Sequence, residues 1–388
     1  MQILYIQTDS IITRDVELAF QNAGCSLIYQ PAPPENDNES AGYLSRLLSN
    51  VKNSDPAFIF SLDFYPFLSL ACGAMGLPYV AWLVKGYDAD YYSSSIRNEW
   101  NYIFAMDSML CQDLQNAGVS HCYYLPLAAP TYSEDVLSAI NPQAQQSVDV
   151  SMIGSILERN DLSLHPLSLE NALKDSTKGY LEGCIACQHQ FHGMPSMSSN
   201  LPGYVWTDLL NGFPPVLDNS ILSAQQFYDY NYFNPMITYA DRDVHLNAYK
   251  NESRYQKIHL YSRPSSYSSE NIINQGWADY YTDIPRIAQQ SKINLVITHR
   301  NYRAGIPPVA WAIMAAKGFL LSNYQADYQS LFSTLPVLYQ DSMDMLSKSA
   351  YYYHHEDERK DLTETLYQEL IKNHTYSARI LEMLSILS

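Results

Sequence analysis

One stretch of the sequence, residues 291–324 (SKINLVITHRNYRAGIPPVAWAIMAAKGFLLSNY), restricts the fold more than any other part of the chain. An apolar, β-rich run over 293–298 leads into a polar turn, and two adjacent prolines then stand where a helix begins. Gly318 ends this helix, and residues 319–322 form a second short strand. Strand, loop, helix and strand in this order predict a βαβ unit, and hence a parallel sheet.

The loop before this helix has the features of an anion site. After Gly305 the helix start offers backbone N–H groups without partners and the positive end of the helix dipole. Phosphates bind at such places, and in parallel α/β sheets ligands bind at the carboxyl ends of strands. The stretch therefore indicates a phosphate or diphosphate site, although every βαβ unit has this shape and many carry no ligand.

The chain of 388 residues is too long for one ordinary core and fits two α/β domains. Short apolar runs such as FIFSL (58–62) alternate with helical patterns up to residue 130, which predicts a doubly wound sheet. We expect a first Rossmann-like domain over 1–146 and a second over 147–388. The second contains strands at 148–153 and 258–261, a mostly helical segment at 160–255 and C-terminal helices.

Composition narrows the class of protein. A net charge of −17, from 23 basic and 40 acidic side chains, argues against nucleic-acid and anionic-membrane partners. The apolar runs are shorter than a membrane span, and the first residues form a strand instead of a signal peptide. We therefore expect a cytoplasmic protein whose six cysteines are reduced and buried.

One short segment contains several residues of the types that bind metals. Cys184, Cys187, His189 and His192 have the chemistry of a zinc site. They fall within nine residues on or directly after one predicted helix, 180–191, whose turn places the two cysteines on one face and rotates the two histidines away. We therefore predict no metal site here.

Several segments together resemble one enzyme family. Residues 291–328 are similar to the C-terminal signature of the CgeB-type, spore-maturation-protein-like glycosyltransferases, and the similarity continues to HTYSAR at 374–379. VSMIGS at 150–155 resembles the start of the family's C-terminal domain, and segments of 58–129 resemble its N-terminal half. The order and spacing of these segments make the resemblance specific, although no single segment does.

The resemblance implies a GT-B fold, in which two Rossmann-like domains enclose a central cleft. It also implies a nucleotide-diphosphate sugar as donor substrate, no cofactor and no metal, because a helix N-terminus and nearby basic or hydroxyl groups hold the diphosphate. The acceptor would be a protein or a glycan. The predicted donor-binding residues all lie in the second domain: Gly154, Ser155, Tyr261, Ser262, Thr298, Arg300, Asn301, Arg303, Ala304, Gly305 and Ile306.

The catalytic base is not dictated by the sequence. Asp9, Asp63 and Asp88 follow predicted strands of the first domain and are candidates by position. Each of them also fits an ordinary cap or turn. Asp88 and Asp90 form a D-x-D pattern, which holds a metal in the other major glycosyltransferase architecture, but that architecture does not have two such domains.

The chain departs from the family pattern at several polar positions. Val309 and Ala312 replace an arginine and an acidic residue, Lys317 replaces a glycine, and Lys85 replaces an acid of the first domain. We expect Arg300 or Arg303 to supply the missing cation and Asp88 or Asp90 the missing carboxylate. The main hypothesis is a metal-independent glycosyltransferase. The alternatives are a catalytically degenerate homologue that acts as a binding subunit, as an oligomer or with an active paralogue, and a plain nucleotide-binding α/β protein.

Overall fold

The computed structural model describes residues 1–34, 37–132, 136, 146–155, 171–188, 197–263 and 269–387. The chain divides into two compact units. The first comprises residues 1–130, 219–221 and 373–388, and the second comprises residues 131–218 and 222–372.

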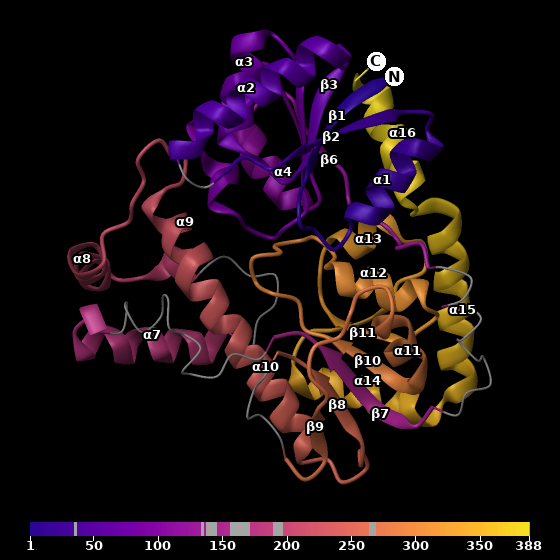
Figure 1. Ribbon diagram of the computed structural model, residues 1–388. Helices are drawn as coiled ribbons and strands as arrows, with labels where there is room; N and C mark the ends of the chain where they lie inside the picture. Colours follow the sequence, from indigo (N-terminus) through magenta and orange to yellow (C-terminus); the bar gives the residue numbers. More distant parts are fainter. Residues whose placement is uncertain are drawn as a thin grey trace. The chain divides into compact units, whose positions relative to one another are not determined.

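The first unit is built on a parallel sheet of order β2-β1-β3-β4-β5-β6 (Figure 1). Its strands are β1 (Gln2–Gln7), β2 (Ser26–Pro31), β3 (Phe58–Leu62), β4 (Tyr79–Leu83), β5 (Asn101–Ala105) and β6 (Cys122–Tyr124). Its helices are α1 (Thr13–Asn22), α2 (Asp37–Ser54), α3 (Pro66–Met75), α4 (Ser108–Asn116) and α16 (Tyr376–Leu387), with 3-10 turns η1 (Ala89–Tyr92) and η2 (Ser94–Arg97). Every residue of β3 and β4 is buried, as their continuous apolar runs predict.

The last helix returns to the first unit. The Nε of Arg379 donates to the carbonyl of Pro126 at 2.9 Å, and the Tyr376 ring lies 6.0 Å from that of Trp82. α16 also packs beside α1 (Figure 1). The observed division therefore differs from the boundaries expected from sequence, 1–146 and 147–388, because these contacts join residues about 250 positions apart.

The second unit contains the other parallel sheet, of order β12-β11-β10-β7-β8-β9. Its strands are β7 (Val148–Ile153), β8 (Ile258–Tyr261), β9 (Ile272–Asn274), β10 (Ser291–Val296), β11 (Leu320–Asn323) and β12 (Val337–Tyr339). The helices packed with this sheet are α10 (Asn234–Lys250), α11 (Asp283–Gln290), α12 (Pro308–Ala315), α13 (Asp327–Leu331), α14 (Ser342–His354) and α15 (Glu356–Asn373).

Between β7 and β8 the described residues 171–188 and 197–255 are mostly helical, as predicted, and have an apolar core of their own that includes Leu181, Val205, Tyr228 and Phe233. Its elements are α7 (Asp175–Gln188), η3 (Met197–Asn200), α8 (Gly203–Gly212), α9 (Ala224–Tyr228) and the π-helical turn η4 (Asp229–Phe233), which runs into α10. The predicted α/β class, with two Rossmann-like sheets, is confirmed. None of the helices in the described ranges has the length and hydrophobicity needed to cross a membrane.

Candidate functional site

The strand order of the second sheet marks where a ligand is expected. From β7 the chain goes through β8 to β9 on one side, and β10, β11 and β12 continue on the other. This is the 3-2-1-4-5-6 order of dinucleotide-binding folds, whose switch point lies between the first and fourth strands. In this sheet the switch point lies between β7 and β10, so the loops after these two strands form the candidate site.

The end of β7 carries two of the predicted donor residues. The Gly154 N–H donates to the Tyr261 carbonyl at 3.1 Å, which joins the ends of β7 and β8. Tyr261 is half-buried, and Ser262 is buried with its N–H on the Asn274 Oδ1 at 3.4 Å. The structure thus brings Gly154, Ser155, Tyr261 and Ser262 to one edge of the sheet.

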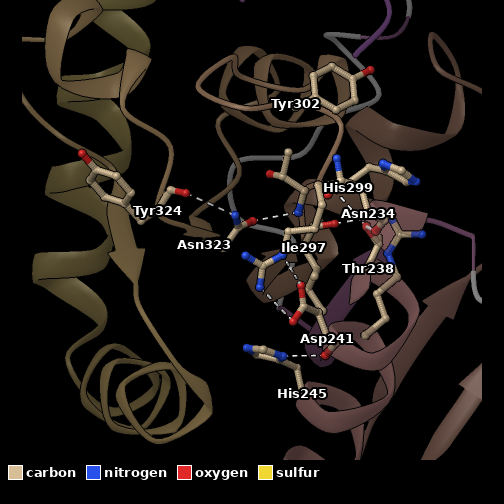
Figure 2. Close-up of polar contacts among 12 residues, drawn as sticks. Asn234, Thr238, Asp241, His245, Ile297, His299, Tyr302, Asn323 and Tyr324 are labelled. Atoms are coloured by element: carbon tan, nitrogen blue, oxygen red, sulfur yellow. Dashed lines mark hydrogen bonds and ion pairs between the residues drawn. The ribbon is translucent and has the colours of Figure 1, made fainter. Parts of the chain in front are cut away.

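The loop from Ile297 to Ile306, which we call the β10 loop, is fixed at both ends. The Thr298 N–H donates to the Asn323 Oδ1 at 2.7 Å (Figure 2). The Ala304 carbonyl accepts from the Asp327 N–H at 3.1 Å. Thr298 is only 3% exposed, and its hydroxyl has no hydrogen-bond partner among the described residues. The loop is therefore held by the end of β11 and the start of α13.

A polar face of α10 supports the β10 loop from the other side. The residues of this face are Asn234, Thr238, Asp241 and His245 (Figure 2). The Asn234 side chain donates to the Asn301 Oδ1 at 3.0 Å, and the Thr238 Oγ1 accepts from the Arg300 N–H at 2.9 Å. His245 is helical and buried.

Arg300 is engaged by this face. Its Nε donates to the Asp241 Oδ2 at 2.7 Å and its Nη2 to the Oδ1 at 3.0 Å, a two-bonded ion pair. The Asp241 side chain is fully buried and that of Arg300 is 12% exposed. The pair fixes the position of the loop, and the carboxylate neutralises the positive charge of Arg300.

A second arginine of α10, Arg242, was not among the predicted residues. Its guanidinium donates through Nη1 to the Ser155 carbonyl and through Nη2 to the Ile297 carbonyl, the latter at 3.3 Å. The side chain is 8% exposed, and burial lowers the pKa of this arginine. Arg242 therefore bridges the ends of β7 and β10 at the switch point.

His299 is neutral in this setting. Burial, with a smaller effect from the charge of Arg242, lowers the pKa of His299 to about 3. The Asn301 N–H donates to the His299 Nδ1 at 3.1 Å, which places the ring proton on Nε2. The imidazole can therefore act as a hydrogen-bond donor at Nε2 near neutral pH, but not as a cation.

The start of α12 follows the β10 loop, as the sequence predicted. The helix begins at Pro308 with no side-chain cap on its first N–H groups. Val309 is half-buried, whereas Ala312 is fully buried and its carbonyl accepts from the Tyr132 hydroxyl at 3.0 Å. A carboxylate at position 312 would therefore be placed in a packed interior, so alanine suits this position.

α12 ends at Ala315, three residues before Gly318, and the left-handed residue of the following turn is Lys317, with φ of 55°. Gly318 has a different role, because a Cβ at this position would stand 2.8 Å from the Ala288 Cβ and 3.1 Å from its carbonyl oxygen. Gly318 thus permits close packing of α12 and β11 against α11, and the chain reverses at Lys317.

The three candidate bases belong to the first unit. Asp9 is exposed after β1. Asp63 follows β3 and is buried, with its Oδ1 accepting from the Val84 N–H at 3.0 Å and from the Tyr91 hydroxyl. Burial raises the pKa of Asp63, against the opposing effects of the Lys85 charge and of these two hydrogen bonds.

Lys85 and Asp88 complete this cluster. The Lys85 Nζ lies 3.3 Å from the Asp63 Oδ2 and 2.8 Å from the Asp88 Oδ2. The other oxygen of Asp88 caps η1 by accepting from the Asp90 N–H at 3.2 Å. An ammonium group thus occupies one oxygen of the first aspartate in the D-x-D pattern, which disfavours a metal there.

The remaining metal candidate is only partly described. Cys184 and Cys187 lie on α7, and both are free thiols. His189 and His192 lie outside the described residues. Within the ranges that the structure covers, no group of three or more His, Cys, Asp or Glu side chains is arranged to hold a metal ion.

The sequence prediction missed the buried polar residues of α10. Asn234, Thr238, Asp241 and His245 are spaced by four, three and four residues, so they repeat on one helical face. When a helix packed into a core carries a stripe of polar side chains, these side chains are expected to have hydrogen-bond partners elsewhere in the fold. That spacing was available in the sequence, but the partners in the β10 loop were not.

Comparisons with known proteins agree with this geometry. Residues 242–385 match a family model described as glycosyl transferase-like. A search of curated proteins gives no match. Solved structures with a similar fold include a glycosyltransferase from Rickettsia africae, with a TM-score of 0.55, 9% identity, and coverage of 100% of this chain and 97% of that one.

Two other solved structures also match the chain over its whole length. Sucrose-phosphate synthase from Thermosynechococcus elongatus has a TM-score of 0.55 and 9% identity over 100% of this chain and 98% of that one. Anabaena HepE, solved with UDP and glucose, has a TM-score of 0.52 and 8% identity over 100% of this chain and 99% of that one. The fold is the GT-B fold, as predicted. The family match covers residues 242–385, and the whole chain shares its fold with these solved structures.

Proposed function

We propose that the chain transfers a sugar from a nucleoside-diphosphate donor, bound by the second unit, to a protein or glycan acceptor. The observation that carries this proposal is the polar edge at the β7–β10 switch point, where Gly154, Ser155 and the β10 loop meet. In parallel α/β sheets this edge is where nucleotides bind. The UDP and glucose in the similar HepE structure support the same class of donor.

For the diphosphate we propose Arg303, the backbone of residues 304–306 and the N-terminus of α12. Arg303 is half-buried in the β10 loop, and its neighbours Ala304, Gly305 and Ile306 are buried. Arg300 forms a bidentate ion pair with Asp241. We therefore propose that Arg300 supports the β10 loop and does not itself contact the diphosphate. Such preorganised donors stabilise the charge that develops on the leaving diphosphate.

For the nucleoside we propose the neighbouring strand ends. Tyr261 and Ser262 follow β8, which is the next strand beyond β7. A half-buried aromatic ring and a hydroxyl suit a base and a ribose. Thr298, whose buried hydroxyl has no partner among the described residues, and Asn301 complete the proposed donor site.

We further propose that catalysis needs no metal and that Asp63 is the leading candidate for the base. Its raised pKa makes the Asp63 carboxylate a stronger base than an ordinary aspartate, and Lys85 keeps this carboxylate oriented. Asp88 is proposed as a second candidate, although it already caps η1, and exposed Asp9 as a third. Membership of the CgeB-type family and a cytoplasmic location, which suits the free cysteines, belong to the same proposal.

The proposal is tested by hydrolysis and transfer assays with a panel of UDP-, GDP- and dTDP-sugars, each with and without EDTA. We expect slow donor hydrolysis with one of these nucleotides, unaffected by EDTA. Asp63→Asn should abolish turnover but keep nucleotide affinity, whereas Asp90→Asn, an exposed neighbour, should keep both. Neither turnover nor a thermal shift with any nucleotide would refute the enzyme function.

A degenerate binding subunit is the second candidate. This alternative is favoured by Lys85, which replaces an acid of the family pattern and is paired with two carboxylates. The apolar residues Val309 and Ala312, which replace an arginine and an acid, favour it too. Such a protein would bind a nucleotide sugar without hydrolysing it and would act as an oligomer or with an active paralogue. Nucleotide affinity without turnover in the same panel would establish this alternative.

A further inference from the structure

We propose that Arg242 is a positioning residue of the donor site. It holds the loops after β7 and β10 together and provides the positive charge that the diphosphate of the donor neutralises. The inference rests on the proposed function and adds to it a residue from α10. Arg242 lies about 60 positions from the β10 loop in sequence, and no motif of the sequence marked it.

The hydrogen bonds of Arg242 span the switch point. Its Nη1 donates to the Ser155 carbonyl, two residues after β7, and its Nη2 donates to the Ile297 carbonyl, directly after β10. A Cβ on Gly154 would lie 3.6 Å from the guanidinium carbon, so the turn after β7 packs directly on this group. The distance between the β7 and β10 loops therefore depends on Arg242.

Among the described residues, no carboxylate lies within ion-pair distance of Arg242, although the charge of Asp241 next to it in sequence favours the charged guanidinium. Asp241 is fully buried and gives both oxygens to Arg300, so these three residues contain two guanidiniums and one carboxylate. Arg242, only 8% exposed, forms no salt bridge among the residues that the structure describes. Burying an ion without an opposite charge costs on the order of several kcal/mol of free energy. A bound anion at this edge would remove that cost.

Two buried polar atoms at the same strand ends point to the same conclusion. The Nε–H of Arg242 and the hydroxyl of Thr298 have no hydrogen-bond partners within the described ranges. Thr298 directly follows Ile297, whose carbonyl binds Arg242. Buried polar groups are normally satisfied, and exceptions of this kind occur where a ligand or water completes the set. A phosphate oxygen is an acceptor of the kind that both of these donors lack among the described residues.

An arginine that only braces the backbone would use the same two carbonyls. The two roles differ in what they do to affinity. A brace positions the whole site, so its loss weakens binding of a nucleoside and of its diphosphate alike. A charge acts on the phosphates, so its loss weakens the diphosphate selectively.

The experiment compares Arg242→Gln and Arg242→Lys with the unmodified protein. Isothermal titration gives the affinities for UDP, GDP and dTDP and for the corresponding nucleosides. Thermal shift with inorganic diphosphate gives a second readout without a nucleoside. Arg254→Gln is the matched control, because it removes a positive charge of the same unit that pairs with Glu252 on the surface.

We expect Arg242→Gln to weaken nucleoside-diphosphate binding at least about tenfold more than it weakens nucleoside binding, because the lost brace affects both ligands and the lost charge only the diphosphate. The diphosphate-induced thermal shift should disappear in Arg242→Gln and persist in part in Arg242→Lys. Equal losses for nucleoside and diphosphate, or no loss, would overturn the inference. If Arg242→Gln does not fold, Arg242→Lys alone decides, since a charge role predicts that lysine retains diphosphate selectivity.

The two proposals fail differently. If the unmodified protein binds no nucleotide, the proposed donor fails. Arg242 is then tested with inorganic diphosphate alone. If diphosphate does not shift the melting temperature of the unmodified protein, the inference is refuted too. If the unmodified protein binds nucleotide and Arg242→Gln binds it equally well, only the inference fails.

Discussion

Arg300 and Asp241 face each other through two hydrogen bonds, of 2.7 Å and 3.0 Å, in the interior of the second unit. This pair joins the middle of α10 to the β10 loop. Removing one member leaves the other charge buried without its partner, which costs more than the pair contributes as a whole.

Asp241→Ala should therefore destabilise the second unit by about 3–5 kcal/mol. Denaturant titration gives the free energy of unfolding. The control is Glu364→Ala, because Glu364 pairs with Lys317 on the surface and exposed pairs contribute at most about 1 kcal/mol. A loss in Asp241→Ala no larger than in this control would contradict the structural role of the pair.

Arg303→Ala tests the proposed diphosphate contact. Loss of a charge-assisted hydrogen bond should weaken nucleoside-diphosphate binding by about 1.5–3 kcal/mol. Calorimetric titration of both proteins measures the difference, and Arg254→Ala serves as the surface control. Unchanged affinity would remove Arg303 from the site.

Gly318→Ala tests the packing of α12. The added methyl would stand 2.8 Å from the Ala288 Cβ, so α11 and α12 must move apart. We expect a loss of about 1–3 kcal/mol in the free energy of unfolding. Gly179→Ala in α7, where nothing lies within 4 Å of the added Cβ, should instead stabilise by about 0.5–1 kcal/mol. Equal effects of the two substitutions would contradict this account.

His299 predicts a pH dependence of stability. Its pKa is lowered from 6.5 to about 3 in the folded protein, chiefly by burial, so the unfolded chain binds a proton that the folded chain does not. The stability associated with the neutral ring is complete above pH 6.5 and is lost as the pH falls toward 3.

His299→Gln should flatten this dependence. Between these pH values the unmodified protein should lose up to about 1.4 kcal/mol per pH unit more than the variant. Urea titrations of both proteins over this range measure the difference, and His354→Gln, a histidine at the end of α14, is the control. Parallel curves for the two proteins would show that His299 takes up its proton in the folded state.

Much of the fold follows from local patterns. Strands β7 and β8 have the predicted bounds, because continuous apolar runs specify them. β9 was missed because it has three residues, of which Ile273 is half exposed and gives no apolar run. α11 was missed although it is amphipathic, since Pro285 lies in its first turn, where proline is tolerated.

The site was predictable in part. The loops after β7 and β10 were found because a glycine–serine turn and a loop before a helix are local features. Arg242 and Asp241 were not, because their roles depend on carbonyls and a guanidinium that are about 60 to 90 positions away in sequence. The return of α16 to the first unit has the same cause. Local periodicity defines an element but not the partner against which it packs.

The most direct test of the account is hydrogen exchange measured by mass spectrometry, with and without the nucleoside diphosphate that binds most tightly. We predict protection in peptides that contain Gly154 and Ser155 and in those that cover residues 297–306, with smaller changes in peptides around β12. Protection confined to the first unit, or no protection in either loop despite bound nucleotide, would contradict a donor site at the β7–β10 switch point.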